Sequence, residues 1–258
     1  MNPIPQTFYQ SWASVAESAA QNIESPWKQN ATLKAVLEHV PFEQGVGFLT
    51  RILAEHKLLP NEIVELCKRN DSIGGGAVQK FSGLGSPVTP SSLRYIFHAC
   101  EVFSAAKAKG VTSMRIVEVG CGYGGLAFVL SMLAPRFGIQ IQKYVLYDLP
   151  GPQALQKKFL EATRIPTQFE FPSCTDFGAS VTGSGWWLIS AYAIGEFDLD
   201  TSSKYLRTLV PHTQFGGGGF LIWNTVAVSP VVFQTVEERV VVLPEVPQTS
   251  VNNRVITW

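Results

Sequence analysis

Acidic residues stand at or just after the ends of four apolar segments: Glu118, Asp148, Asp176 and Glu196. These segments have the length and composition of β-strands, and stretches with helical periodicity separate most of them. Because the carboxyl ends of parallel strands meet at one edge of a sheet, we expect the four carboxylates to lie along that edge. Carboxylates there can hydrogen-bond a ribose diol, balance a cationic ligand or accept a proton during catalysis.

The first acid lies beside a glycine-rich turn that links an apolar strand to a helix, so a ligand can approach the backbone closely. Gly120, Gly122 and Gly125 satisfy the GxGxxG spacing of dinucleotide-binding proteins. Glu118 argues against a pyrophosphate, which its carboxylate would repel, and suits the cationic methionine part of S-adenosylmethionine. Together with Asp148, placed for a ribose diol, the turn predicts a nucleoside-binding βαβ unit.

This segment resembles motif I of class I S-adenosylmethionine-dependent methyltransferases, E/D-x-G-x-G-x-G, through Glu118, Gly120, Gly122 and Gly124. A narrower resemblance, over roughly residues 71–224, is to a family of sugar O-methyltransferases. It rests on the segments SPVTPSSLRY (86–95), EVGCGYGGL (118–126), YDLP (147–150) and SAYAIGE (190–196). The sequence departs from that family at Cys121, where a glycine is common, and at Ala191, where an asparagine is common.

The resemblance implies S-adenosylmethionine as the cofactor and a sugar hydroxyl as the methyl acceptor. Residues expected to bind the cofactor are Glu118, Gly120, Gly122, Gly124, Asp148, Asp176, Arg94 and Tyr95. Within this set, Asp176 would meet the adenine amine, and Arg94 would pair with the methionine carboxylate or with an acidic substrate. The expected catalytic residues are Glu196, as general base, and Tyr192, stacked on the sugar or the donor. No metal ligand is expected.

Each of these side chains also has a structural alternative. Asp176 could cap a helix, and Glu196 could be a first-turn acid that favours the next helix dipole. Arg94 could be a surface arginine, and Tyr192 a packed strand aromatic. Alternative activities are methyl transfer to another small molecule or natural product, an NAD(P)-dependent oxidoreductase, and a cofactor-binding module without catalysis.

The pattern of apolar residues predicts an α/β fold. Helices are predicted within residues 1–70, from Pro90 to near Gly110 with Thr89 as N-cap, and at 126–137, 153–163 and 201–209. Strands are predicted at 114–119, 142–147, 168–171, 186–191, 220–224, 239–243 and 254–258. We therefore expect a Rossmann-like class I methyltransferase sheet, mostly parallel with a terminal antiparallel hairpin, preceded by a helical N-terminal cap.

Two units are expected along the chain. Residues 1–110 form a helical cap and substrate lid, which includes the loop 71–90 with Gly74–Gly76 as its hinge. Residues 111–258 form the S-adenosylmethionine-binding domain. Two stretches, 177–195 and 208–236, contain no Asp, Glu, Lys or Arg, as expected for strands that are buried on both faces.

The amino-acid composition limits the classes of partner expected for this protein. The 258 residues carry 20 basic and 20 acidic side chains, so the net charge is zero and nucleic acid is not expected. No membrane span or signal peptide is predicted, and four scattered cysteines are typical of free thiols in the cytoplasm. The expected partner is a small-molecule or saccharide acceptor, and a homo-oligomer is left open.

Overall fold

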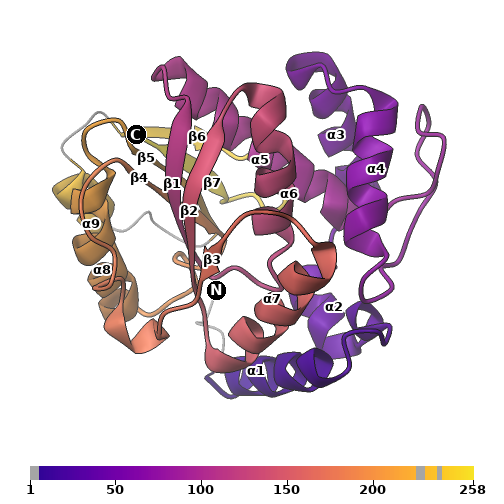
Figure 1. Ribbon diagram of the computed structural model, residues 1–258, viewed down its shortest axis with the longest axis horizontal. Coiled ribbons are helices and arrows are strands. Elements are labelled where there is room, and N and C mark those ends of the chain that lie inside the picture. Colours follow the sequence, from indigo (N-terminus) through magenta and orange to yellow (C-terminus); the bar gives the residue numbers. More distant parts are fainter. Residues whose placement is uncertain (1–5, 225–229, 237–239) are drawn as a thin grey trace.

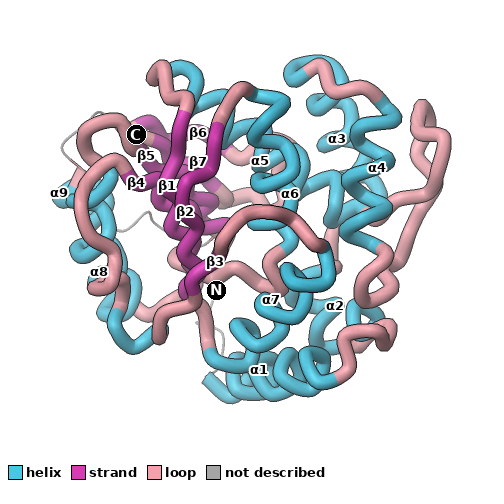
Figure 2. Tube along the Cα trace, viewed as in Figure 1, coloured by secondary structure: helices cyan, strands magenta, loops and turns pink. Residues whose placement is uncertain are grey.

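The computed structural model describes residues 6–224, 230–236 and 240–258 (Figures 1 and 2). Its described residues form a seven-stranded sheet in the order β3-β2-β1-β4-β5-β7-β6. The strands are β1 (Ser113–Val119), β2 (Gln140–Tyr147), β3 (Phe169–Glu170), β4 (Trp186–Ala191), β5 (Gly218–Trp223), β6 (Val241–Pro244) and β7 (Arg254–Thr257). Neighbouring strands among β1–β5 are parallel, whereas β7 runs antiparallel to both β5 and β6. This is the predicted class I methyltransferase sheet, and the fold prediction is confirmed.

Helices cover both faces of the sheet (Figure 1). α5 (Pro90–Ala108), α6 (Gly125–Leu133) and α7 (Pro150–Thr163) pack on one face, and α8 (Leu199–Leu209) and α9 (Pro230–Thr235) on the other. Every residue of β5, and all but the last of β4, is buried. The two uncharged stretches of the sequence therefore do mark central strands covered on both faces.

The N-terminal cap shares its core with the α5–α7 face of the sheet. It comprises α1 (Gln6–Gln21), η1 (Trp27–Gln29), α2 (Ala31–Leu37), α3 (Phe42–Arg51), η2 (Ile52–His56) and α4 (Pro60–Asp71). A single hydrophobic cluster joins Trp12 and Phe48 of the cap to Phe159 of α7. α1 runs directly beneath α7 in Figure 1, and a Cβ on Gly151 would lie 2.0 Å from the Ala13 carbonyl oxygen. α1 is thus packed against the start of α7, which follows the carboxyl end of β2, while α3 and α4 pack on α5.

The loop between α4 and α5 is fastened at both ends. Thr89 is the N-cap of α5 as predicted, since its hydroxyl accepts the Ser92 amide. Asp71, at the end of α4, accepts hydrogen bonds from the Thr89 amide at 2.9 Å and the Ser92 hydroxyl at 2.6 Å. Gly74 has a φ of 82°, and a Cβ there would lie 2.3 Å from the Trp27 ring. Of the glycines predicted to be a hinge, Gly74 and Gly75 are held against η1 and Gly76 faces Thr89, and the lid role of residues 71–90 stays a prediction.

Two boundaries that differ from the predicted ones illustrate local causes and the limits of the described residues. The helix predicted at 126–137 is α-helical only to Leu133 and continues as the 3₁₀ turn η3 (Ala134–Phe137), where Pro135 cannot donate a helical hydrogen bond. The predicted strand 239–243 begins at Val241, and Arg239 lies outside the described residues.

No helix in the described part of the chain is long and apolar enough to cross a membrane.

Candidate functional site

The glycine turn after β1 is built around positions that exclude a side chain. Gly120, Gly122 and Gly124 have φ angles of 74°, 57° and 92°, a region in which glycine is free of strain. A Cβ on Gly120 would lie 1.9 Å from that of Ala193, and one on Gly122 would lie 2.8 Å from Leu37 Cδ2. The turn is therefore enclosed between the segment that follows β4 and the end of the cap helix α2.

Asp148, at the end of β2, fastens this turn. Its Oδ2 accepts the Cys121 amide at 2.8 Å and the Gln156 side-chain amide at 2.9 Å, and its Oδ1 accepts the Leu149 amide at 2.8 Å. Burial raises the pKa of Asp148 to about 7, although the hydrogen bonds from the Leu149 and Cys121 amides favour the charged form. The half-buried carboxylate stands where the sequence predicts a ribose contact, and that contact stays a prediction.

Glu118 lies beneath the turn and is 2% exposed. Its carboxylate accepts a hydrogen bond from the Tyr144 hydroxyl on the neighbouring strand. Burial raises its pKa to about 8, and the negative charge of Asp148 adds to that rise. The structure thus places Glu118 in a buried pair with Tyr144, while its predicted contact with the methionine part of a cofactor remains untested.

Asp176 belongs to the short turn η4 (Cys174–Asp176) after β3. Its carboxylate accepts the Gly178 amide at 2.8 Å and the Tyr147 and Ser180 hydroxyls. The N-cap of η4 is Ser173, so the helix-capping alternative does not apply to Asp176 within this turn. Asp176 and Asp148 follow adjacent strands, as predicted, and the contact of Asp176 with adenine stays a prediction.

Glu196 follows β4 and pairs with the end of β5. The Asn224 side-chain amide donates a hydrogen bond to Glu196 Oε1. α8 begins at Leu199, with Asp198 as its N-cap and Asp200 in its first turn. The first-turn alternative for Glu196 is therefore excluded, and the general-base role stays a prediction.

Tyr192 is held at the end of β4 by a residue that the sequence did not suggest. The tyrosine has a φ of 74°, unusual for a residue with a side chain. Its hydroxyl donates to Glu245, which is 2% exposed and also accepts hydrogen bonds from the Thr249 amide and the Asn253 side chain at 2.9 Å each. Glu245 is the single charged residue of segment 240–253, and that isolation is the signal that could have identified it.

Arg94 lies inside the protein, which excludes the surface alternative. It is 5% exposed, its Nη2 donates to the Leu37 carbonyl at 3.2 Å, and its guanidinium lies 5.3 Å from the Tyr192 ring centroid. Tyr95 is also buried, and a Cβ on Gly125 would lie 2.7 Å from its ring. Burial raises the pKa of Tyr95 to about 12. Arg94 thus faces the region between the turn and β4, whereas Tyr95 supports the helix start from below.

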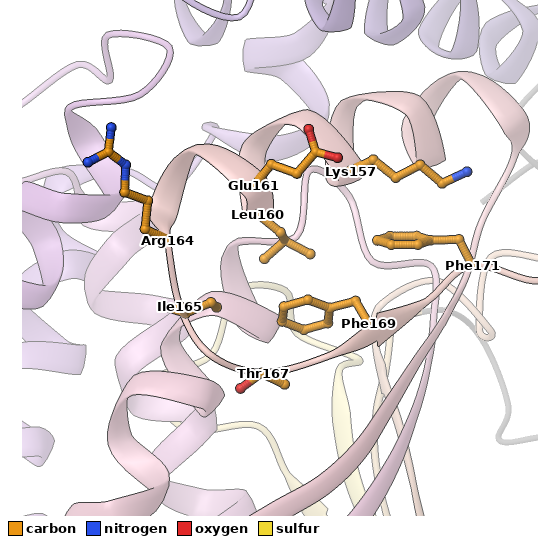
Figure 3. Close-up of a pocket in the computed structure, with 8 residues that line it drawn as sticks. All are labelled: Lys157, Leu160, Glu161, Arg164, Ile165, Thr167, Phe169 and Phe171. Atoms are coloured by element: carbon orange, nitrogen blue, oxygen red, sulfur yellow. The ribbon is translucent and has the colours of Figure 1, made fainter.

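Two other features lie apart from this site. Among the described residues, one group of His, Cys, Asp or Glu side chains lies close enough together to hold a metal ion: Glu55, His56 and Glu101. Both carboxylate oxygens of Glu55 already accept hydrogen bonds from Arg51. A groove of about 270 Å³ opens between α7 and β3, where Phe169 and Phe171 face it in Figure 3. None of the predicted site residues lines that groove.

No protein-family model and no curated protein matches the sequence. Among solved structures, the N-methyltransferase NodS from Bradyrhizobium japonicum WM9, in complex with S-adenosyl-L-homocysteine, is 15% identical over 97% of this chain and 96% of that one, with a TM-score of 0.43. An S-adenosylmethionine-dependent methyltransferase from Clostridium acetobutylicum ATCC 824 is 14% identical over 51% and 49%, with a TM-score of 0.38. The amino pentose methyltransferase CalS10 from Micromonospora echinaspora is 16% identical over 49% and 50%, with a TM-score of 0.39. The chain thus spans about half the length of the latter two proteins, and the assignment of the fold rests on its strand order.

Proposed function

We propose that this protein is an S-adenosylmethionine-dependent methyltransferase. The observation that carries the proposal is the bond between the Asp148 carboxylate and the Cys121 amide, because it joins the glycine turn to an acid at the end of β2. On a sheet with this strand order, that junction suits a nucleoside, with its ribose hydroxyls at Asp148 and its adenine near Asp176. The absence of side chains on the turn favours close approach of a ligand to its backbone, beside Ala193 and Leu37.

We further propose that the acceptor is a sugar hydroxyl. The cofactor, when bound, supplies an electrophilic methyl group. Glu196 then accepts the hydroxyl proton as the oxygen attacks, while Asn224 holds the carboxylate in place through its amide. The Tyr192 ring stands at the end of the same strand and suits stacking on a sugar face. The motifs shared with sugar O-methyltransferases support a saccharide over other small molecules.

Ligand binding tests the first part of this proposal. In a thermal-shift series with S-adenosylhomocysteine, NAD and NADP, we expect the melting temperature to rise with S-adenosylhomocysteine alone, since a ligand that binds the folded state stabilises it. A rise with NAD or NADP and none with S-adenosylhomocysteine would instead support an oxidoreductase. Isotopic label transferred from methyl-labelled S-adenosylmethionine to a panel of saccharides and phenolic natural products then identifies the acceptor class.

Glu196→Gln tests the general base once an acceptor is known. With saturating cofactor, we expect the rate to fall by about 10²–10⁴-fold while S-adenosylhomocysteine affinity is retained, because the amide cannot accept the proton. Asp198→Asn, at the N-cap of α8, is the matched control and should leave the rate nearly unchanged. An unchanged rate in Glu196→Gln over the pH range would remove Glu196 as the base.

A further inference from the structure

Buried polar atoms without a hydrogen-bond partner gather where the cap meets α5. Ser91 Oγ and Arg94 Nε lie one turn apart on α5, and Glu38 Oε1 belongs to the residue that ends α2. Within the described part of the chain these three atoms form no well-aligned hydrogen bond, although the residues are only 1%, 5% and 7% exposed; the Ser91 hydroxyl does lie close enough to Glu38 to oppose the rise of its pKa. Buried polar groups in proteins are nearly always paired, so three such atoms in one region indicate a ligand that supplies the partners.

These atoms border the glycine turn. Arg94 Nη2 donates to the carbonyl of Leu37, the residue before Glu38, at 3.2 Å. The Leu37 side chain in turn reaches to within 2.8 Å of the position that a Cβ on Gly122 would take. Since the guanidinium also lies beside the Tyr192 ring, Glu38 and Arg94 flank the space between the turn and the end of β4. A cofactor with its ribose at Asp148 would extend its amino acid end toward this space.

The two charges influence each other without forming a close ion pair. No ion pair within 4.0 Å joins Glu38 to Arg94 among the described residues. Lys28, the other buried cation here, donates to the Asn70 carbonyl at 2.6 Å and lies 4.5 Å from the Tyr123 ring centroid. Burial raises the pKa of Glu38, while the charge of Lys28, the hydroxyl of Ser91 and the charge of Arg94 oppose that rise. A buried acid and a buried guanidinium that form no ion pair among the described residues are complementary to a zwitterion, whose ammonium and carboxylate neutralise one each.

We infer that Glu38 and Arg94 bind the α-amino acid end of the cofactor, Glu38 Oε1 accepting from the ammonium group and Arg94 Nε donating to the carboxylate. This inference rests on the proposed function. Ser91 Oγ lies on the same face of α5 and offers a further hydrogen bond to the carboxylate. The cationic methionine part predicted to meet Glu118 is therefore bound by an acid of the cap, while Glu118 remains paired with Tyr144.

Ligands that differ only at the amino acid end test this inference. S-adenosylhomocysteine carries both groups, its decarboxylated analogue keeps the amine alone, and 5′-methylthioadenosine has neither. By titration calorimetry, we expect Glu38→Gln to weaken the first two ligands by about 10- to 100-fold, the range for a lost hydrogen bond to a charged group. Arg94→Met should weaken S-adenosylhomocysteine alone to a similar extent. Neither change should shift 5′-methylthioadenosine affinity by more than about 2-fold.

Two control variants accompany this test, and the results that would contradict the inference differ from those that would contradict the proposed function. Glu43→Gln and Arg207→Met alter exposed residues of α3 and α8 and should leave all three affinities unchanged. Equal weakening of 5′-methylthioadenosine, or unchanged S-adenosylhomocysteine affinity, overturns the inference. A wild-type protein that binds the three ligands equally well overturns it without need of any variant, while the methyltransferase proposal stands. A wild-type protein that binds none of them overturns both.

Discussion

The two ends of the candidate cofactor site differ in how their polar groups are satisfied. On the ribose side, the carboxylates of Asp148 and Asp176 accept hydrogen bonds from backbone amides of the protein, which include those of Cys121, Leu149 and Gly178. On the cap side, Glu38 Oε1 and Arg94 Nε, with Ser91 Oγ, are buried without partners among the described residues.

This difference separates preorganised groups from groups that need a ligand. A carboxylate that already holds three amides is fixed in position before any nucleoside arrives, so binding costs little further ordering. An unpaired buried ion lowers stability until its partner is supplied. We therefore expect changes on the ribose side to affect both folding and every nucleoside ligand, and changes on the cap side to affect only ligands with an amino acid end.

Asp148→Ala should give the largest effect and sharpen this contrast. Removal of the carboxylate leaves the Cys121 and Leu149 amides and the Gln156 side chain without their acceptor, each at a cost of about 1–3 kcal/mol when buried. We expect affinity for S-adenosylhomocysteine and 5′-methylthioadenosine to fall together by about 100-fold, measured by calorimetry, with a lowered melting temperature. Asp200→Ala, on exposed α8, is the control. Loss of one ligand but not the other would break the division between the two ends.

Glu118→Gln comes next, and its effect should appear in stability rather than in binding. Because burial raises the pKa of Glu118 to about 8 from an ordinary 4.5, the folded protein keeps a proton that the unfolded chain releases. Stability from this group is therefore complete below about pH 4.5 and is lost as the pH rises to about 8. Urea unfolding at pH 5 and pH 8 should show a decline in wild type that the variant reduces by about 1–4 kcal/mol.

The control for this change is Glu161→Gln, an exposed acid on α7 that should leave the pH dependence intact. Some decline should persist in Glu118→Gln, because burial also raises the pKa of Asp148 to about 7. A variant that loses S-adenosylhomocysteine binding at constant stability would return Glu118 to the cofactor site and contradict the assignment of that role to Glu38.

Glu245→Gln should have a smaller effect, on the position of Tyr192. If the glutamine oxygen accepts from the Tyr192 hydroxyl, its NH2 group faces the Thr249 amide donor; in the reverse orientation, the Tyr192 hydroxyl loses its acceptor. We expect the unfolding free energy to fall by about 1–2 kcal/mol and the methyl-transfer rate to fall at saturating cofactor. Affinity for 5′-methylthioadenosine should stay constant. If a Tyr192→Phe variant had the same methyl-transfer rate as Glu245→Gln, the hydrogen bond from the Tyr192 hydroxyl to Glu245 would be confirmed as the contact that positions the ring.

The sequence predicted the fold well because its signals are local. An apolar strand followed by Gly120, Gly122 and Gly124 needs a turn that excludes side chains, and the structure has it. Thr89 and Pro90 predicted the start of α5 because capping depends on adjacent residues. Uncharged stretches predicted the two central strands because burial on both faces excludes ions.

The candidate site was less predictable because its contacts join distant segments. Glu38 and Arg94 come near each other where Arg94 of α5 donates to the Leu37 carbonyl at the end of α2, and no motif around Glu38 indicates this. The bond between Tyr192 and Glu245 spans 53 residues and depends on the order in which β7 inserts beside β5. For Glu118, the sequence predicted the place at the end of β1 but not the hydrogen-bond partner. That partner, Tyr144, depends on the register between β1 and β2.

Asp176→Asn should have the smallest effect and tests how far the ribose side extends. Asp176 is partly exposed, and its carboxylate is engaged by Gly178, Ser180 and Tyr147. An asparagine can keep its oxygen toward the Gly178 amide, while its NH2 group replaces the oxygen that accepts from Ser180 and Tyr147. Since these contacts lie near solvent, we expect S-adenosylhomocysteine affinity to fall by about 2- to 5-fold. Calorimetry with inosine and adenosine forms of the ligand decides the role. If the asparagine variant discriminates between the two bases as well as wild type does, Asp176 shapes its own turn and the adenine is read elsewhere.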